Sequence, residues 1–305
     1  MNRGVLYGLG AYLLWGILPI YWKMLHNVPA MEIVAQRVLW STVILTVLLV
    51  ATQRFRHTAA ALRSGRTLVA VAAASVFLAT NWLVYVWAVN AGRVVDTSLG
   101  YFMNPLVNVL LGVLFFKERL RPWQWVSIGV AATGVVWLTV QYGSLPWIGL
   151  TLAFTFGFYG LLKKLSRLDA MEGLSAEMGL LLAPMLVLLA LPYLMPDGNP
   201  VTLNPLTLVL LMLSGVATVG PLLLFGAAAR SIPLTVLGLL QYIAPTMQFL
   251  LGVLVFHEPF SLQLLVGFVL IWTALAIYTL EGLARRRRYA LAHRPIVPSD
   301  NSALS

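Results

Sequence analysis

The 305-residue sequence contains no cysteine, which excludes disulfide bonds, thiolate metal sites and cysteine nucleophiles. Charge is also scarce, because Asp, Glu, Lys and Arg make up only 10% of the residues, whereas a soluble domain carries about 25%. The chain has no HExxH, no GxSxG and no phosphate-binding glycine loop. We therefore expect no enzymatic activity, no cofactor and no metal site.

Apolar sequence, by contrast, is abundant: hydrophobic residues make up 60% of the chain, and the mean hydropathy is +0.88. The apolar runs are about 18 to 24 residues long, and helices of that length cross a ~30 Å hydrocarbon core. The alternating pattern of barrel strands is not seen. The sequence predicts an all-α integral membrane protein with ten transmembrane helices, at residues 4–24, 32–52, 67–91, 97–117, 123–141, 146–164, 174–195, 205–227, 234–256 and 261–281.

Basic residues fall almost entirely on one side of these spans. Placing both termini in the cytoplasm puts 17 of the 20 Lys and Arg residues there; Lys23 and Arg93 then lie outside, and Arg37 lies within a span. This asymmetry predicts a multi-pass protein of the plasma (bacterial inner) membrane with cytoplasmic termini. Because topology explains the net charge of +10, we expect membrane lipids as partners and no nucleic acid.

One segment of the chain occurs twice. Residues 105–118 read PLVNVLLGVLFFKE and residues 245–258 read PTMQFLLGVLVFHE, with eight identical positions at an offset of 140. Further matches relate the first five spans to the last five, and an odd number of spans requires the second half to enter the membrane from the opposite side. We therefore predict two inverted five-helix halves, 1–143 and 144–284, followed by a basic, disordered cytoplasmic tail at 285–305.

Inverted repeats are typical of secondary transporters, whose substrate site lies between the halves near the membrane midplane. This organisation predicts a permease that moves small organic solutes outward by alternating access. A non-transporting sensor or scaffold is the alternative, although it would need a soluble domain or docking loop, and the loops here are short. An intramembrane enzyme would need paired carboxylates or a nucleophile with a base, which the spans do not offer. The sequence leaves a homodimer open.

Five motifs carry a family resemblance. LWG-x-x-P-x-Y-W-K (14–23), ME-I-x-x-x-R-x-x-W-S (31–41), NW-x-x-Y-x-W-A-x-N (81–90) and SLGYF-x-NP (98–105) lie in the first half, and LG-x-x-QYI-x-P (237–245) lies in the second. With these motifs the chain resembles the RarD-type permeases of the drug/metabolite transporter superfamily, which consist of two EamA-type halves. The resemblance implies a ten-helix inner-membrane permease for drug-like or metabolite-like compounds.

Two ionisable residues lie inside predicted spans, where each charge costs about 2.5–3.5 kcal/mol on insertion scales. Arg37 lies in the second span, and its counterpart in the seventh is Glu177. We expect Arg37 to face a central cavity, where it attracts an anionic or zwitterionic solute or pairs with Glu177; a structural ion pair or an arginine that reaches the headgroups is the alternative. Proton coupling would need a cavity carboxylate, and Glu177 is the deep candidate.

Amides and prolines occupy matching places in the two halves. Asn104 and Asn108 lie one turn apart on one helical face, and Asn108 aligns with Gln248. Such amides form either interhelical hydrogen bonds or solute contacts. Pro105 and Pro245 each remove a backbone hydrogen bond, and paired kinks predict hinges suited to alternating access.

Aromatic residues of the third span form a further group. Trp82 and Tyr85 either line a cavity for an apolar or aromatic solute or pack against lipid and neighbouring helices, whereas Trp22 fits an interfacial belt. Tyr101 and Tyr242 belong to the family motifs. The candidate solute-contacting residues are Arg37, Asn81, Trp82, Tyr85, Tyr101, Asn104, Asn108, Gln241, Tyr242 and Gln248.

Overall fold

The computed structural model describes residues 3–25, 27–90, 94–142, 147–194, 204–255 and 262–292. Helices dominate this part of the chain, and no strand occurs within it. The helices are α1 (Arg3–Lys23), α2 (Ala30–Ala51), α3 (Phe55–Leu62), α4 (Gly65–Asn90), α5 (Val94–Phe116), α6 (Pro122–Tyr142), α7 (Trp147–Leu165), α8 (Ala170–Leu194), α9 (Pro205–Ser231), α10 (Leu234–Gln241), α11 (Ile243–Leu254) and α12 (Leu262–Ala292).

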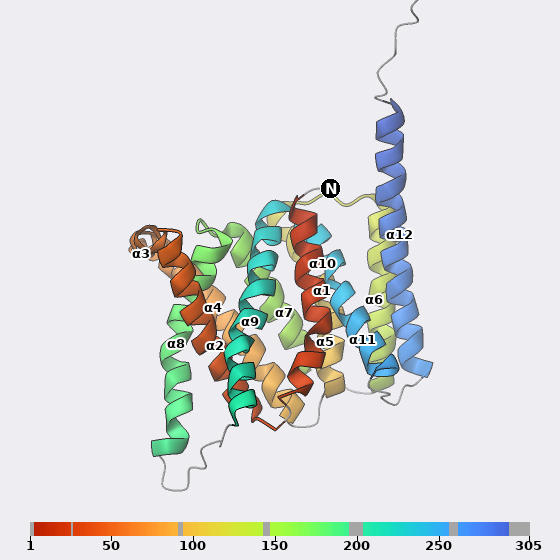
Figure 1. Ribbon diagram of the computed structural model, residues 1–305. Coiled ribbons are helices and arrows are strands. Elements are labelled where there is room, and N and C mark those ends of the chain that lie inside the picture. The colour runs from red at the N-terminus through yellow and green to blue at the C-terminus, as the bar shows by residue number, and fades with distance from the viewer. Residues whose placement is uncertain are drawn as a thin grey trace, which may run out of the picture.

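Seven of the described helices are long and apolar enough to cross a membrane: α1, α2, α4, α6, α7, α8 and α9. Shorter apolar stretches lie in α5 and α12. The expected helical membrane protein is confirmed, whereas ten spans in two inverted halves stay a prediction. The helices run side by side, and α1 begins at the end of the bundle where α12 finishes (Figure 1). We call this the proximal end and the opposite one the distal end.

Local sequence explains how two of the helices begin. Before α8, the Asp169 carboxylate accepts a hydrogen bond from the Glu172 backbone N–H at 2.8 Å, and the Glu172 carboxylate accepts one from the Asp169 N–H at 3.3 Å. This reciprocal capping box satisfies N–H groups that have no partner within the helix. Before α9, Asn204 accepts from the Thr207 N–H at 2.7 Å, and Pro205 takes the first helical position, where no N–H is needed.

The largest packing contacts join the two predicted halves. Helix α1 packs against α9 and α11, and its counterpart α7 packs against α4 and α5. Helix α2 packs against α8, α6 against α12, and α5 against α10. Each of these pairs joins a helix of one predicted half to a helix of the other. The helices of the two predicted halves therefore alternate in the bundle instead of forming two separate groups. The core between them contains the fully buried Tyr12, Tyr159 and Phe225.

Three segments differ from expectation. Residues 55–62 form the short helix α3, which the turn at Gln53 (φ 57°) separates from α2. The span expected at 234–256 is divided between α10 and α11 at Tyr242, because Pro245 has no N–H to donate to the carbonyl four residues earlier. Finally, α12 continues to Ala292, so the first part of the expected disordered tail is helical.

Candidate functional site

A cavity of about 380 Å³ lies among α1, α2, α4, α5, α7, α9, α10 and α11. Its lining on α1 runs from Tyr12 to Lys23, the half of that helix toward the distal end. The volume is within the range of small-molecule sites, about 300–1,000 Å³. Eight of the ten expected solute-contacting residues line it: Arg37, Asn81, Trp82, Tyr85, Tyr101, Asn104, Gln241 and Gln248.

Arg37 is held at this cavity by two aromatic rings and one hydroxyl group. Its guanidinium carbon lies 4.7 Å from the ring centroid of Trp22 and 4.8 Å from that of Trp82. Its Nε donates a hydrogen bond to the Thr218 hydroxyl at 2.9 Å. Cation–π contacts contribute about 0.5–2 kcal/mol each, so the two rings offset part of the cost of placing a charge in the membrane.

The cavity is electropositive. Among the described residues that line it, Arg37 and Lys23 are cationic and none is Asp or Glu. No carboxylate of the described chain lies within ion-pair distance of Arg37. An anionic group beside Arg37 would therefore gain a charge-assisted hydrogen bond without competing with an internal carboxylate, and such bonds contribute about 1.5–3 kcal/mol.

An aromatic cluster borders the cavity: Tyr12, Trp15 and Phe156 line it, and Phe225 and Tyr159 lie behind them. The ring centroid of Trp15 lies 5.7 Å from those of Phe156 and Phe225, and Phe225 stacks on Tyr159 at 6.0 Å. Tyr12 contacts both Trp15 and Phe225. Tilted and edge-on ring pairs of this kind are favourable beyond the area they bury. The cavity thus offers an apolar, ring-lined surface beside its cationic one.

Most of the expected amides serve as links between helices. Asn81 donates to the Leu152 carbonyl and to the Thr155 hydroxyl, each at 3.0 Å, and Gln248 donates to the Trp15 carbonyl at 3.1 Å. Both nevertheless line the cavity. Asn104 is different, because its Oδ1 is buried without a hydrogen-bond partner among the described residues. It is therefore the amide best placed to accept a hydrogen bond from a solute.

Helix α5, which carries Pro105, crosses α10 at close range. A Cβ atom on Gly238 of α10 would lie 2.8 Å from the Pro105 carbonyl oxygen and 2.9 Å from the Asn108 Cβ, so only glycine allows this approach. One turn further, Asn108 donates a hydrogen bond to the Gln241 side-chain oxygen at 2.7 Å. Pro105 lies within continuous α5, whereas the Pro245 ring lines the cavity just after the break between α10 and α11.

Two expected solute contacts lie away from the cavity lining. Asn108 is fully buried and donates a hydrogen bond to the side chain of Gln241, which lines the cavity. Tyr242 is 1% exposed and packs with Phe102, Leu239 and Ile271 in a separate apolar cluster.

Glu177 has a partner that the sequence did not suggest. Its Oε1 lies 2.9 Å from the Lys163 ammonium, and its Oε2 accepts a hydrogen bond from the Tyr159 hydroxyl at 3.1 Å. The pairing with Arg37 is therefore wrong. Lys163, assigned by sequence to the cytoplasmic face, is only 3% exposed. Since Tyr159 also belongs to the aromatic cluster, that cluster lies between the cavity and this ion pair.

The proximal end is closed by contacts between the predicted halves. Glu118 accepts hydrogen bonds from the backbone N–H groups of Leu234 and Thr235 at 3.0 and 3.1 Å, and from the Thr235 hydroxyl at 2.5 Å. The Lys164 ammonium lies 3.5 Å from Glu118 and donates to the Ile232 carbonyl at 2.9 Å. We call Glu118, Lys164 and the start of α10 the proximal latch. Its counterpart in the repeat, Glu258, lies outside the described residues.

Sequence reasoning missed three residues of this region. Trp22 was assigned to an interfacial belt but contacts Arg37 in the cavity. Thr218 is a polar residue in an apolar stretch of α9, a signal that could have been used. Lys163 was counted among the 17 basic residues assigned to the cytoplasmic side. No group of three or more His, Asp or Glu that could hold a metal ion occurs within the described part of the chain.

Comparison with known proteins places this geometry in a family. The EamA-like transporter family matches residues 2–140. An uncharacterized transporter of Pseudomonas aeruginosa is 41% identical, covering 94% of this chain and 97% of its own length. The RarD protein of Streptomyces exfoliatus is 42% identical over 94% of this chain and 91% of its own length; for RarD of Escherichia coli the values are 39%, 94% and 97%.

A protein of known crystal structure has the same fold, with a TM-score of 0.68 over 93% of this chain and 98% of its own. At 21% identity this likeness concerns the fold alone. The span-capable helices and the bacterial transporter relatives together make the chain a multi-pass membrane transporter of the bacterial inner membrane. With relatives about 40% identical over nearly its whole length, the chain belongs to the EamA-like transporter family and, within it, to the RarD-type permeases.

Proposed function

We propose that this permease is a secondary transporter that exports small organic solutes bearing an anionic group, by alternating access of the central cavity. The observation that carries the proposal is Arg37, a cation in a cavity whose described lining contains no carboxylate. The aromatic cluster beside it suits an apolar or ring-containing body. Arg37, Asn81, Trp82, Tyr85, Tyr101, Asn104, Gln241 and Gln248 form the proposed solute site, with Asn108 and Tyr242 in supporting positions.

Alternating access is supported by the asymmetry of closure along the bundle. The cavity occupies the distal half, whereas the proximal latch and tight α1–α9 packing close the other end. A Cβ atom on Gly4 would lie 2.7 Å from side-chain atoms of Ser231 and Ile232, which shows how closely these helices meet there. The proposed transporter has ten spans in two inverted halves. In its transport cycle the proximal latch opens while the distal end closes, and the helices bend at hinges formed by Pro105 and Pro245.

The orientation in this proposal follows the distribution of basic residues: the proximal end faces the cytoplasm and the distal end faces outward. Export then begins with loading from the proximal side and ends in the distal-facing state that the cavity describes. Direction is tested by comparing right-side-out and inverted membrane vesicles. Accumulation in inverted vesicles only is expected.

Glu177 is the proposed site of proton coupling, and its contacts define how it would act. Neutralising Glu177 would break the ion pair with Lys163, leaving an unpaired ammonium next to Tyr159 and the aromatic cluster. Because an unpaired buried charge is costly, protonation would favour a rearrangement that hydrates Lys163. Proton binding and solute movement would thus be linked through the helices that separate the two sites.

The decisive experiment is solute flux into proteoliposomes that contain the purified chain, with and without a pH gradient. The panel contrasts carboxylates and zwitterions with amines and neutral ring compounds of similar size. Carboxylate flux should fall about tenfold or more in Arg37→Gln, because a charge-assisted hydrogen bond is lost, and less in Arg37→Lys. Arg230→Gln, on an exposed arginine in the last turn of α9, is the matched control and should leave flux unchanged.

The results separate the function from its details. A correctly inserted protein that moves no member of the panel would favour the alternative, a non-transporting sensor or scaffold. If carboxylate flux is equal in the wild type and Arg37→Gln, the protein is still a transporter, but Arg37 does not bind the solute. If flux is independent of the pH gradient in both the wild type and Glu177→Gln, Glu177 does not couple transport to protons.

A further inference from the structure

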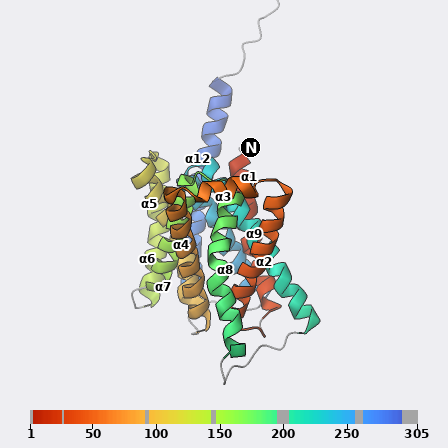
Figure 2. The same ribbon diagram turned by 90° about the vertical axis from the view of Figure 1, so that its left-hand side faces the viewer.

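The short helix α3 lies across the proximal end of the bundle, between the end of α2 and the start of α4 (Figure 2). Its inner side is apolar: Ala61 and Leu62 pack against a small cluster formed by Val71, Leu168 and Ala176. A helix that lies across the ends of membrane spans is at the level of the lipid headgroups. Its outer side therefore meets the membrane interface.

The exposed residues in and beside α3 carry positive charge and include one large aromatic residue. Arg56, Arg63 and Arg66 are all exposed, and Phe55 is 53% exposed. No Asp or Glu occurs between residues 52 and 68. An exposed aromatic ring beside several basic residues is the composition of segments that lie in the membrane interface. We call these four residues and α3 the interfacial patch.

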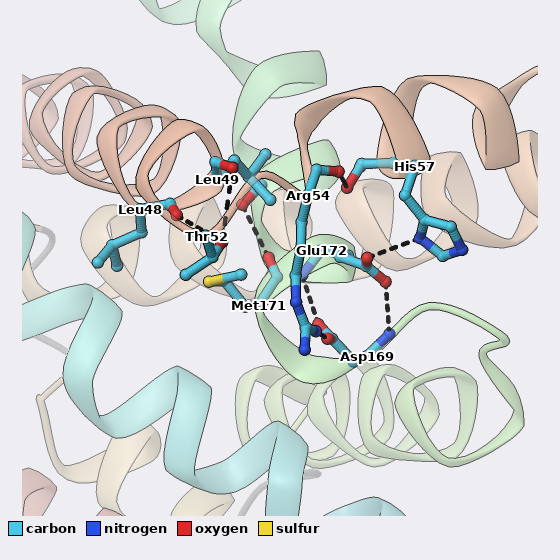
Figure 3. A network of polar contacts seen from close by, with 10 residues as sticks. Leu48, Leu49, Thr52, Arg54, His57, Asp169, Met171 and Glu172 are labelled. Atoms are coloured by element: carbon cyan, nitrogen blue, oxygen red, sulfur yellow. Dashed lines mark hydrogen bonds and ion pairs between the residues drawn. The ribbon is translucent and has the colours of Figure 1, made fainter.

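The patch contacts α8 through one ion pair and one histidine–carboxylate contact (Figure 3). Arg54, just before α3, pairs with Asp169, and the His57 Nδ1 lies 2.7 Å from the Glu172 carboxylate. Asp169 and Glu172 form the capping box of α8, so both contacts act on the first turn of that helix. Helix α8 also carries Glu177, less than two turns further along.

We propose that the interfacial patch is a docking site for the headgroups of anionic phospholipids, and that an occupied patch fixes the start of α8. The lipid phosphates balance Arg56, Arg63 and Arg66, and the Phe55 ring enters the headgroup layer beside them. Topology alone requires only that basic residues lie on this side of the membrane. It does not require a helix that holds them along the interface and contacts the cap of α8 through Arg54 and His57.

The expected strength follows from surface electrostatics. Each basic residue near an anionic membrane surface contributes about fivefold to binding, which corresponds to about 1 kcal/mol. Removal of two such residues should therefore weaken binding roughly 25-fold at low salt. The effect should shrink as ionic strength rises, because exposed charges are screened beyond about 10 Å at 0.1 M salt.

The binding test is a titration of the purified full chain with phosphatidylglycerol or phosphatidylcholine, followed by native mass spectrometry. Phosphatidylglycerol should bind more tightly to the wild type, and Arg56→Gln/Arg63→Gln should lose roughly tenfold or more of that affinity. Arg56→Lys/Arg63→Lys should keep most of it. The matched control is Arg119→Gln/Arg230→Gln, which removes two exposed arginines elsewhere in the chain and should have little effect.

The coupling test uses Asp169→Asn, which removes the ion pair with Arg54 but keeps a residue that caps helices well. In vesicles of rising phosphatidylglycerol content, the thermal unfolding temperature of the wild type should increase. In Asp169→Asn this increase should fall by at least half, although phosphatidylglycerol binding itself stays unchanged. Neither readout requires a transported solute, so failure of this proposal is distinguishable from failure of the transport function.

Three results would overturn the proposal. Equal affinity of the wild type for the two lipids would remove the docking site. Equal losses of phosphatidylglycerol affinity in the patch and control variants would show that the lipid binds through the overall positive charge of this face and not through the interfacial patch. A wild-type unfolding temperature that does not respond to phosphatidylglycerol would remove the action on α8.

Discussion

The Glu177 carboxylate lies 2.9 Å from the Lys163 ammonium, with both side chains almost completely buried. Removal of one partner from such a pair typically costs about 3–5 kcal/mol, because the other charge stays buried and unpaired. We predict losses of this size in the free energy of unfolding for Lys163→Met and for Glu177→Gln. The combined variant should lose clearly less than the sum, measured by unfolding in mixed micelles. Strictly additive losses would show that the two residues stabilise the fold independently.

The two indole rings around Arg37 give a second prediction. Trp82→Leu should weaken the affinity for carboxylate solutes about three- to tenfold, because one cation–π contact of about 0.5–2 kcal/mol is lost and the guanidinium is less well held. Trp82→Phe should weaken it less. Solute binding to the purified chain, measured by calorimetry, provides the comparison. The prediction fails if Leu and Phe at this position give the same affinity.

The crossing of α5 and α10 depends on Gly238. In Gly238→Ala the new methyl group would meet the Pro105 carbonyl and Asn108, so we expect a loss of about 1–3 kcal/mol in stability. Gly129→Ala, at a helical glycine with open space around the Cβ position, is the matched control. It should be neutral or stabilising by up to about 1 kcal/mol, because alanine favours helices. A stable Gly238→Ala protein would contradict the observed helix approach.

Opening of the proximal latch is measurable because the native chain has no cysteine that would give background labelling. Ile232 is 4% exposed at the closed end, so a thiol in Ile232→Cys should react slowly with a water-soluble reagent. Glu118→Gln weakens three hydrogen bonds at the start of α10 and should accelerate the reaction about tenfold. The control is Glu281→Gln, which removes the ion pair with Arg121 elsewhere. Equal rates in all backgrounds would exclude Glu118 as a latch.

The proposed orientation is tested in the same cysteine-free background. Gln53 lies at the proximal end, between α2 and α3, and Leu194 lies at the other end of α8, 76% exposed. A membrane-impermeant maleimide added to intact cells should label Leu194→Cys and spare Gln53→Cys. Permeabilised cells should show labelling of both. The reverse pattern in intact cells would invert the orientation and the proposed direction of transport.

Much of the cavity could be found from the sequence, because polar and charged residues in a membrane span are costly and thus conspicuous. Arg37, the amides of the repeated helices and the aromatic residues of α4 were identified in this way, and eight of the ten expected residues line one cavity. The short helix α3 was missed because it is too short and too polar to produce the signal of a span. The break at Tyr242 was missed because a proline in a membrane helix predicts a kink without fixing its extent.

The sequence by itself determined the class of the molecule, since long apolar runs without cysteine and with clustered basic residues leave little besides a helical membrane protein. It also singled out Arg37 and Glu177 as charged residues inside predicted spans. Only the tertiary structure decided the partners of those residues. The spacing within one helix is silent about the neighbouring helix, so Glu177 could be matched to Arg37 by repeat position and still pair with Lys163. Contacts between interleaved helices are set by packing, which no periodicity within a single span encodes.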